Sequence, residues 1–146
     1  MSWDVLVLNC GGNPADEAGE ERPLGPAARV RMSISAHLPG VDWSDPAWGV
    51  YDGDGFSIEF NTGKRSPIAS IMLHVRGGGD AIPAMLAFAN PNGWSLFDCS
   101  TSEFLDPENP SPEGWEGFQA FRDKAVGRSG GTKPKGKAKK PKGKKK

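Results

Sequence analysis

The sequence predicts an α+β fold, in which helices pack on one face of a mostly antiparallel sheet in the order β-α-β-β-β-α-β-α. Two patterns support this prediction. Apolar and polar residues alternate in 56–61 and again in 68–75, which is the period of a half-buried strand. Residues 26–38 carry an apolar residue at every fourth position, which places one stripe on a helix face. The stripe consists of Val30, Ile34 and Leu38.

The expected strands are rich in Val, Leu and Ile or alternate in polarity. They cover 3–9, two short segments of 48–61 around an Asp-Gly turn, 68–75 and 94–100. A turn at 62–67 separates the two segments with the clearest alternation, so we expect these segments to pair as an antiparallel hairpin. Residues 11–24 and the Trp/Asp/Pro-rich segment before Trp48 are expected to be loops.

The first two helices have recognisable ends. Pro26 suits the first helical position, where a missing N–H costs nothing, and Pro39-Gly40 ends that helix. In the second helix, 80–89, Asp80 is a suitable N-cap and Asn92-Gly93 closes the helix.

A third helix is expected over 111–126. Trp115, Phe118 and Phe121 would lie along one of its sides, so we expect this helix to pack back on the body.

Length and composition set the class of protein. A chain of 146 residues usually forms one domain with a core of its own. It has no apolar run of about eighteen residues, so we expect no membrane span. The start, MSWDVLVLNC, lacks a basic region and a cleavage site, and it is typical of a strand rather than a signal peptide. With Cys10 and Cys99 as the two cysteines, we expect reduced thiols and a cytoplasmic protein.

Charge divides the chain into two parts. Eighteen basic and eighteen acidic residues give a net charge of zero. Ten of the basic residues and no acid lie in 127–146, which leaves a net charge of −10 in 1–126. Lysine, glycine and proline cannot bury enough surface to offset the entropy of ordering. We therefore expect a compact acidic domain, 1–126, followed by a disordered Lys-rich tail, 127–146.

The tail has the composition of a non-specific polyanion binder, because its charges displace counterions from phosphates. It has no aromatic residues to stack on bases. Two interpretations stay open: the tail binds nucleic acid, or it lies on and masks its own acidic body. The lysines concerned are Lys133, Lys135, Lys137, Lys139, Lys140, Lys142, Lys144, Lys145 and Lys146.

The stretch HVRGGGDA, 74–81, places three glycines between a strand and a helix, where backbone N–H groups can face an anion. The known fingerprints fail. Asp80-Ala81 stands where a P-loop has Gly-Lys-Ser/Thr, and Ile82 stands where a dinucleotide loop has glycine. We therefore expect a tight joint, with anion binding as the weaker alternative. The anion-binding residues would be Arg76, Gly77, Gly78 and Gly79.

Glu59, His74 and Arg76 are expected on the polar side of the hairpin, and they are the weak catalytic candidates. A Glu–His pair can act as a general base with its orienter, and an arginine holds a carboxylate or phosphate. The commoner explanation is a salt-bridge patch on a solvated sheet face. No metal site is expected, because Asp52-Gly53-Asp54-Gly55 lacks the later ligands of a calcium loop and predicts a hairpin turn.

Two tryptophans lie among four aspartates in the segment 42–54. Aromatic residues among acids are typical of a binding surface for a basic partner. The favoured explanation is that the tryptophans seal the edge of the core. The candidate binding residues are Asp42, Trp43, Asp45, Trp48, Asp52 and Asp54.

Four phrases, SWDVLVLN, GDGFSIEFN, MLHVRGGGDA and DCSTSEFLD, resemble a small bacterial family of uncharacterised proteins. The resemblance covers about residues 2–106. It implies no known activity and assigns no functional residue, and the basic tail lies outside it.

Small size and acidity, rather than this resemblance, predict a non-enzymatic binding protein of the immunity or inhibitor type, which neutralises a basic protein partner. One alternative is a nucleic-acid-associated accessory protein anchored by its tail. Another is a small enzyme or anion-binding domain that uses the Gly77–Gly79 turn. No cofactor, metal or membrane partner is expected.

Overall fold

The computed structural model describes residues 1–10 and 22–129. The chain divides into two units, one spanning Ser2–Gly114 and the other combining Met1 with Trp115–Lys146. The third helix, α3, spans Glu113–Ser129, so it includes the first three residues of the expected tail. The remainder of that tail lies outside the described residues. The packing of the third helix on the body stays a prediction.

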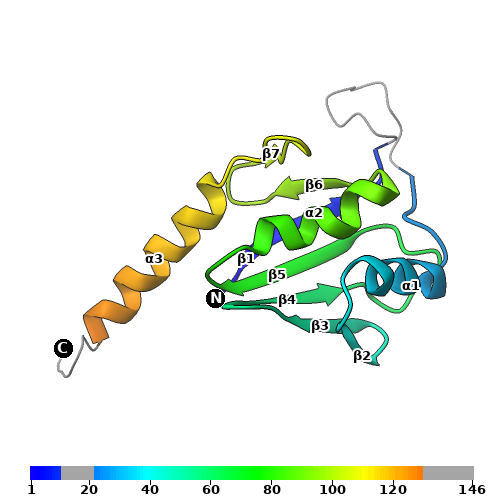
Figure 1. Ribbon diagram of the computed structural model, residues 1–146, viewed down its shortest axis with the longest axis horizontal. Helices are drawn as coiled ribbons and strands as arrows, with labels where there is room; N and C mark the ends of the chain where they lie inside the picture. The colour runs from blue at the N-terminus through cyan, green and yellow to red at the C-terminus, as the bar shows by residue number, and fades with distance from the viewer. Residues whose placement is uncertain (11–21, 130–146) are drawn as a thin grey trace. The chain divides into compact units, whose positions relative to one another are not determined.

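Within the described residues, seven strands form one antiparallel sheet in the order β2-β3-β4-β5-β1-β6-β7 (Figure 1). The α+β prediction is therefore confirmed. The strands are β1 Trp3–Leu8, β2 Asp42–Asp45, β3 Trp48–Asp52, β4 Phe56–Asn61, β5 Ile71–Gly77, β6 Ser95–Asp98 and β7 Glu103–Phe104. The helices in the same unit are α1 Ala27–His37 and α2 Ala81–Asn92.

The sequence does not predict two of these strands. β2 forms in a segment expected to be a loop, because its two end residues pair with Val50 and Trp48 of β3. β7 is only two residues long and pairs with the end of β6. The expected hairpin of β4 and β5 is confirmed, with Phe60 opposite Leu73.

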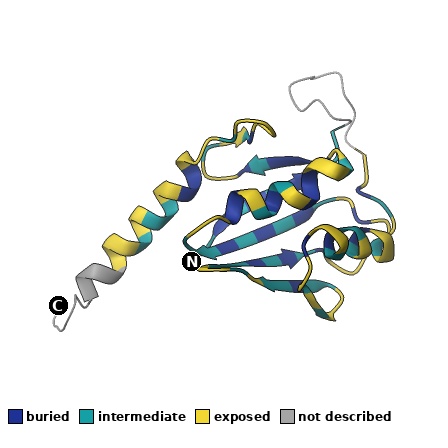
Figure 2. Cartoon of the chain, in the orientation of Figure 1, coloured by how far each residue is buried: buried dark blue, intermediate teal, exposed yellow. Residues whose placement is uncertain are grey.

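The core lies between one face of the sheet and the two helices. Buried residues alternate with half-buried residues along β5 (Figure 2). The buried set on β1 is Trp3, Val5 and Val7. On the helix side, Phe88 of α2 lies 5.5 Å from the Phe60 ring, measured between centroids. Ser33 of α1 and Asn92 of α2 are hydrogen-bonded at 3.0 Å, so both helices cover the same face.

The ends of the two helices differ in part from the prediction. Pro26 is the N-cap of α1 and not its first helical residue, because its ψ of 139° is extended. The Pro26 carbonyl nevertheless accepts the first helical hydrogen bond, from the Val30 N–H. Asp80 is the N-cap of α2 as expected, but its side chain makes no capping hydrogen bond. Gly93 ends α2 in the left-handed conformation, as expected.

The glycine run is a tight joint. The Gly78 N–H donates to the carbonyl of Gly55 at 2.7 Å, in the turn between β3 and β4. Gly77 has φ +95°, and a Cβ there would lie only 2.4 Å from the same carbonyl oxygen. The run therefore stays free of side chains because another backbone turn packs directly on it. The Asp-Gly hairpin turn is also confirmed, with the Gly53 N–H bonded to the Phe56 carbonyl.

A buried carboxylate organises the turn after β6. Asp98 is 1% exposed, and its Oδ1 accepts a hydrogen bond from the indole N–H of Trp3 at 3.0 Å. The same oxygen accepts the backbone N–H and the hydroxyl of Ser100. Strand β1 and the β6–β7 turn are thus joined through one acceptor.

Two glycine substitutions separate backbone strain from steric overlap. Gly63 has φ +74°, and no atom lies within 4 Å of the Cβ that alanine would add. Gly63→Ala should therefore lower the free energy of unfolding by about 1 kcal/mol, through backbone strain alone. Gly77→Ala should cost about 1–3 kcal/mol more, because the Gly55 backbone must move. Urea unfolding measures both values. Equal losses for the two variants would contradict the packing explanation.

Removal of the buried acceptor should cost more than removal of one donor. Trp3→Phe keeps the ring in the core and loses one hydrogen bond, which should cost about 1 kcal/mol. Asp98→Ala leaves the Trp3 and Ser100 donors without their acceptor and should cost about 3 kcal/mol. Urea unfolding of both variants tests this order, and an Asp98→Ala variant as stable as Trp3→Phe would refute it.

Candidate functional site

The second face of the sheet is covered by neither α1 nor α2, and we call it the open face. Residues directly opposite each other on paired strands share a face. His74 pairs with Glu59 on one side and with Asp4 on the other, which assigns all three to the open face. By register the face comprises Asp4, Leu6, Leu8, Asp42, Trp48, Val50, Asp52, Ser57, Glu59, Asn61, Met72, His74, Arg76, Ser95, Phe97 and Phe104. Ser2 joins the face through its hydrogen bond to Asp4.

Strand register arranges much of the open face in two parallel rows that cross the strands. The charged row runs across five strands and contains three carboxylates and a histidine. Its members, from β2 to β1, are Asp42, Val50, Glu59, His74 and Asp4.

The apolar row lies beside the charged row and crosses six strands. All of its side chains are half-buried, so the row remains partly accessible. At its far end, the Phe97 and Phe104 rings pack edge to face, with centroids 5.1 Å apart. The members, from β3 to β7, are Trp48, Asn61, Met72, Leu6, Phe97 and Phe104, and Asn61 is the one polar residue among them.

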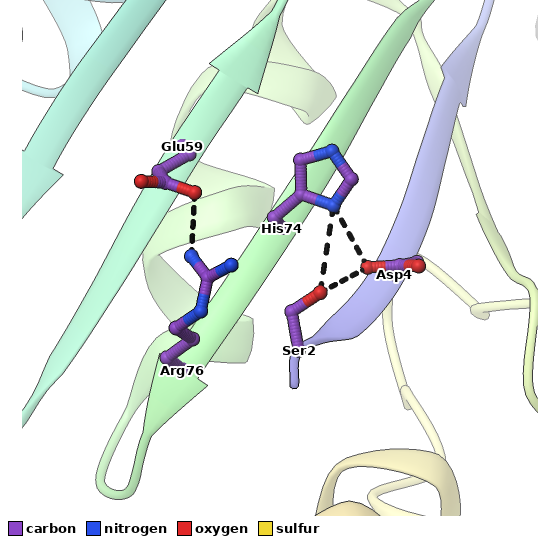
Figure 3. A network of polar contacts seen from close by, with 5 residues as sticks. All are labelled: Ser2, Asp4, Glu59, His74 and Arg76. Carbon is purple, nitrogen blue, oxygen red and sulfur yellow. Dashed lines mark hydrogen bonds and ion pairs between the residues drawn. The ribbon is translucent and has the colours of Figure 1, made fainter.

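His74 is held in place from two sides. Its Nδ1 lies 2.9 Å from Oδ1 of Asp4, and the Trp48 ring stacks on the imidazole with centroids 5.6 Å apart (Figure 3 shows the polar contacts). A carboxylate only accepts, so Nδ1 carries the proton and donates it to Asp4. The imidazole is therefore fixed with Nε2 directed away from Asp4.

Ser2 completes this network without forming a catalytic triad. The Ser2 hydroxyl donates to the same Asp4 oxygen at 2.6 Å, and it lies 3.5 Å from Nδ1 of His74. In a Ser-His-Asp triad, the serine and the carboxylate contact opposite nitrogens of the imidazole. Here both contact Nδ1, so His74 does not activate the Ser2 hydroxyl. The network is built to hold side chains in position.

The expected cluster of Glu59, His74 and Arg76 lies on one face, but its pairing differs from the prediction. Glu59 accepts a hydrogen bond from Arg76, and the orienter of His74 is Asp4 instead (Figure 3). The side chains of the ion pair are 28% and 43% exposed, and such a pair contributes little to stability. Sequence reasoning missed Ser2 and Asp4, although alternation along 3–9 places Asp4 opposite the buried side.

The structure separates the six candidate binding residues. Asp42, Trp48 and Asp52 lie on the open face, and Asp54 is exposed in the adjoining turn. Trp43 lies on the helix side, where its indole N–H donates to the Ser35 hydroxyl at 3.0 Å. Asp45 pairs with Trp48 at the edge of the open face, and it also lines a cavity together with basic residues.

Asp42 remains ionised well into the acidic range. The Ser44 hydroxyl and then the Ser44 backbone N–H donate to its carboxylate, and these bonds lower the pKa of Asp42. This end of the charged row therefore keeps its negative charge.

The weak anion-binding candidates are occupied within the protein. Arg76 pairs with Glu59, and the Gly78 N–H is bonded to Gly55. The nine lysines of the tail, from Lys133 to Lys146, lie outside the described residues.

The described residues contain neither a metal-binding cluster nor a membrane-spanning helix. Across 1–10 and 22–129, no three His, Cys, Asp or Glu side chains gather closely enough to hold a metal ion. None of the helices in these ranges has the length and hydrophobicity that crossing a bilayer requires.

Comparison with known protein families, with curated proteins and with solved structures finds no match to this chain. The geometry of the open face is therefore the basis for assigning a function.

Cys99 lies just after β6 and near two carboxylates. By surface area it is exposed, yet neighbouring atoms still remove part of the water around its thiol. This desolvation raises the pKa of Cys99, and the negative charges of Asp4 and Asp98 raise it further. A thiol with a raised pKa is a poor nucleophile at neutral pH.

Alkylation of Cys99 should therefore depend on Asp4. In a Cys10→Ser background, the rate of iodoacetamide reaction should rise with pH to a midpoint above the ordinary thiol pKa of 9.0. Asp4→Asn removes one repelling charge, so it should lower this midpoint and speed the reaction at pH 8. An unchanged pH profile in Asp4→Asn would contradict the electrostatic cause.

Proposed function

We propose that this protein is a non-enzymatic binding protein of the immunity or inhibitor type, which neutralises a basic protein partner through its open face. The observation that carries the proposal is the pair of rows on that face. A strip of accessible apolar side chains lies beside a strip of carboxylates, on a sheet face that α1 and α2 leave uncovered.

Charge supports a basic partner. The unit Ser2–Gly114 contains sixteen acidic and six basic residues. On the open face itself, Asp4, Asp42, Asp52 and Glu59 outnumber a single guanidinium, that of Arg76. Complementary potentials speed the encounter of two proteins and disfavour acidic competitors.

The dimensions of the rows favour an amphipathic helix of the partner. Neighbouring strands lie about 4.8 Å apart, so a row that crosses six strands spans about 24 Å. An α-helix of about 16 residues has this length. A helix laid along the rows would place an apolar stripe over Trp48, Met72 and Leu6, and a Lys/Arg stripe over the charged row.

The fixed imidazole supports a binding role. Asp4 and Trp48 hold His74 in one orientation, and the nearby Ser2 hydroxyl is bonded to the carboxylate. A preorganised polar group costs little entropy when a partner docks on it. We also propose a cytoplasmic location, which the unpaired state of Cys10 and Cys99 supports.

Capture from native lysate tests the proposed surface. The full-length chain is the bait, after nuclease treatment, in salt of about 0.15 M. We expect a stoichiometric basic protein on the wild type. We expect at least about tenfold less of it on Trp48→Ala and on the double variant Asp42→Asn/Asp52→Asn.

The matched control is Glu103→Gln/Glu108→Gln. Both glutamates are exposed and lie off the open face, so the control removes the same charge elsewhere. It should retain the partner. Equal losses in the control and in the Asp42/Asp52 variant would show that only net charge matters. A parallel capture without nuclease shows whether nucleic acid binds. If the bait captures nucleic acid there and no protein after nuclease treatment, the tail is favoured as the interacting part and the proposal is defeated.

A further inference from the structure

A cavity of about 350 Å³ opens at one end of the sheet and is separate from the open-face rows. Three segments form its walls. α1 contributes Arg31, the turn after β4 contributes Lys64 and Arg65, and the end of β2 with the turn after it contributes Asp45, Pro46 and Ala47. Figure 1 shows α1 beside the end of β4, and a hydrogen bond from the Ala27 N–H to the Ser66 hydroxyl joins these two segments.

The cavity concentrates positive charge in an acidic unit. Ser2–Gly114 has six basic residues, and three of them line this cavity. No ion pair joins these three to another side chain in the described part of the chain. Like charges held close together repel, so the cluster would be stabilised by an anion from outside the protein.

The surroundings of these three basic residues also favour a negatively charged ligand. The first turn of α1 contains no acidic residue, and its N-cap, Pro26, offers no side-chain acceptor. α1 itself therefore supplies no negative charge at the positive end of its dipole, where the neutral Ser66 hydroxyl accepts the Ala27 N–H. The single carboxylate in the wall, Asp45, already accepts the Ala47 N–H through Oδ1 at 3.0 Å.

We propose that this cavity binds a small phosphate monoester that also carries a hydroxyl group. Arginine matches two phosphate oxygens at once, and lysine adds a point charge, so Arg31, Arg65 and Lys64 suit a phosphate dianion. The second oxygen of Asp45 accepts the hydroxyl of the same molecule. The volume is that of a small-molecule site, and three cationic side chains line it.

The test uses the full-length chain labelled with nitrogen-15, because individual amides distinguish the cavity from the Lys-rich tail. The probes are inorganic phosphate and glycerol 1-phosphate in salt of about 0.15 M. Glycerol 1-phosphate should shift the amides of Ala27, Ala47, Gly63 and Lys64 with one saturating curve. It should bind more tightly than inorganic phosphate, since it alone reaches Asp45.

Three variants make the result specific. Arg31→Gln and Lys64→Gln should each weaken binding about tenfold, because each loses a charge-assisted hydrogen bond. Arg29→Gln is the matched control. Arg29 is exposed on the same helix and lines a different cavity, so its loss should change affinity by less than about twofold. The amide spectrum of each variant shows that the sheet is intact.

Three results would overturn the proposal. Shifts confined to tail amides would assign phosphate binding to the lysines. Equal weakening by Arg29→Gln and Arg31→Gln would reduce the effect to net charge. Stronger, saturable shifts of the cavity amides by a short RNA than by glycerol 1-phosphate would identify a nucleic-acid site. Each result leaves the open face and its protein partner unaffected.

Discussion

The packing of Phe60 against Phe88 holds the helices to one face of the sheet. Their rings lie 5.5 Å apart, and contacts continue from Phe60 to Trp43 and from Phe88 to Trp94. Such aromatic pairs add about 0.5–1.5 kcal/mol to the free energy gained from burial. Phe88 belongs to α2, and the Trp43 indole N–H donates to Ser35 of α1, so both helices are held on the side of Phe60.

Because α1 and α2 pack on the same face of the sheet, the open face is formed by strand side chains. With the helices on the core side, every second residue of each strand projects from the opposite side of the sheet. The antiparallel register then aligns these residues into rows, as Asp4, His74 and Glu59 show. The rows are thus a consequence of strand pairing. Loss of register by one residue would bury the charged row and expose the core.

Local patterns in the sequence predict individual strands and the face on which their residues lie. Alternation found β4, β5 and the shared face of Glu59, His74 and Arg76. Alternation did not predict which of these side chains bond to each other. The partner of His74 lies on β1, and the position of β1 between β5 and β6 depends on contacts between distant segments. Asp4 therefore escaped notice as the partner of His74. β2 was missed for a similar reason, since only its pairing with β3 makes it a strand.

Opposite charges are segregated within the same unit, and Asp45 marks the boundary. By register Asp45 pairs with Trp48 at the end of β2, yet it also lines the cavity with Arg31, Lys64 and Arg65. A negative face attracts cationic surfaces and a positive cavity attracts small anions, so each would repel the ligand of the other. An acidic unit can therefore hold the proposed anion site, because the residues that line the cavity, and not the net charge of the unit, determine the electric field inside it.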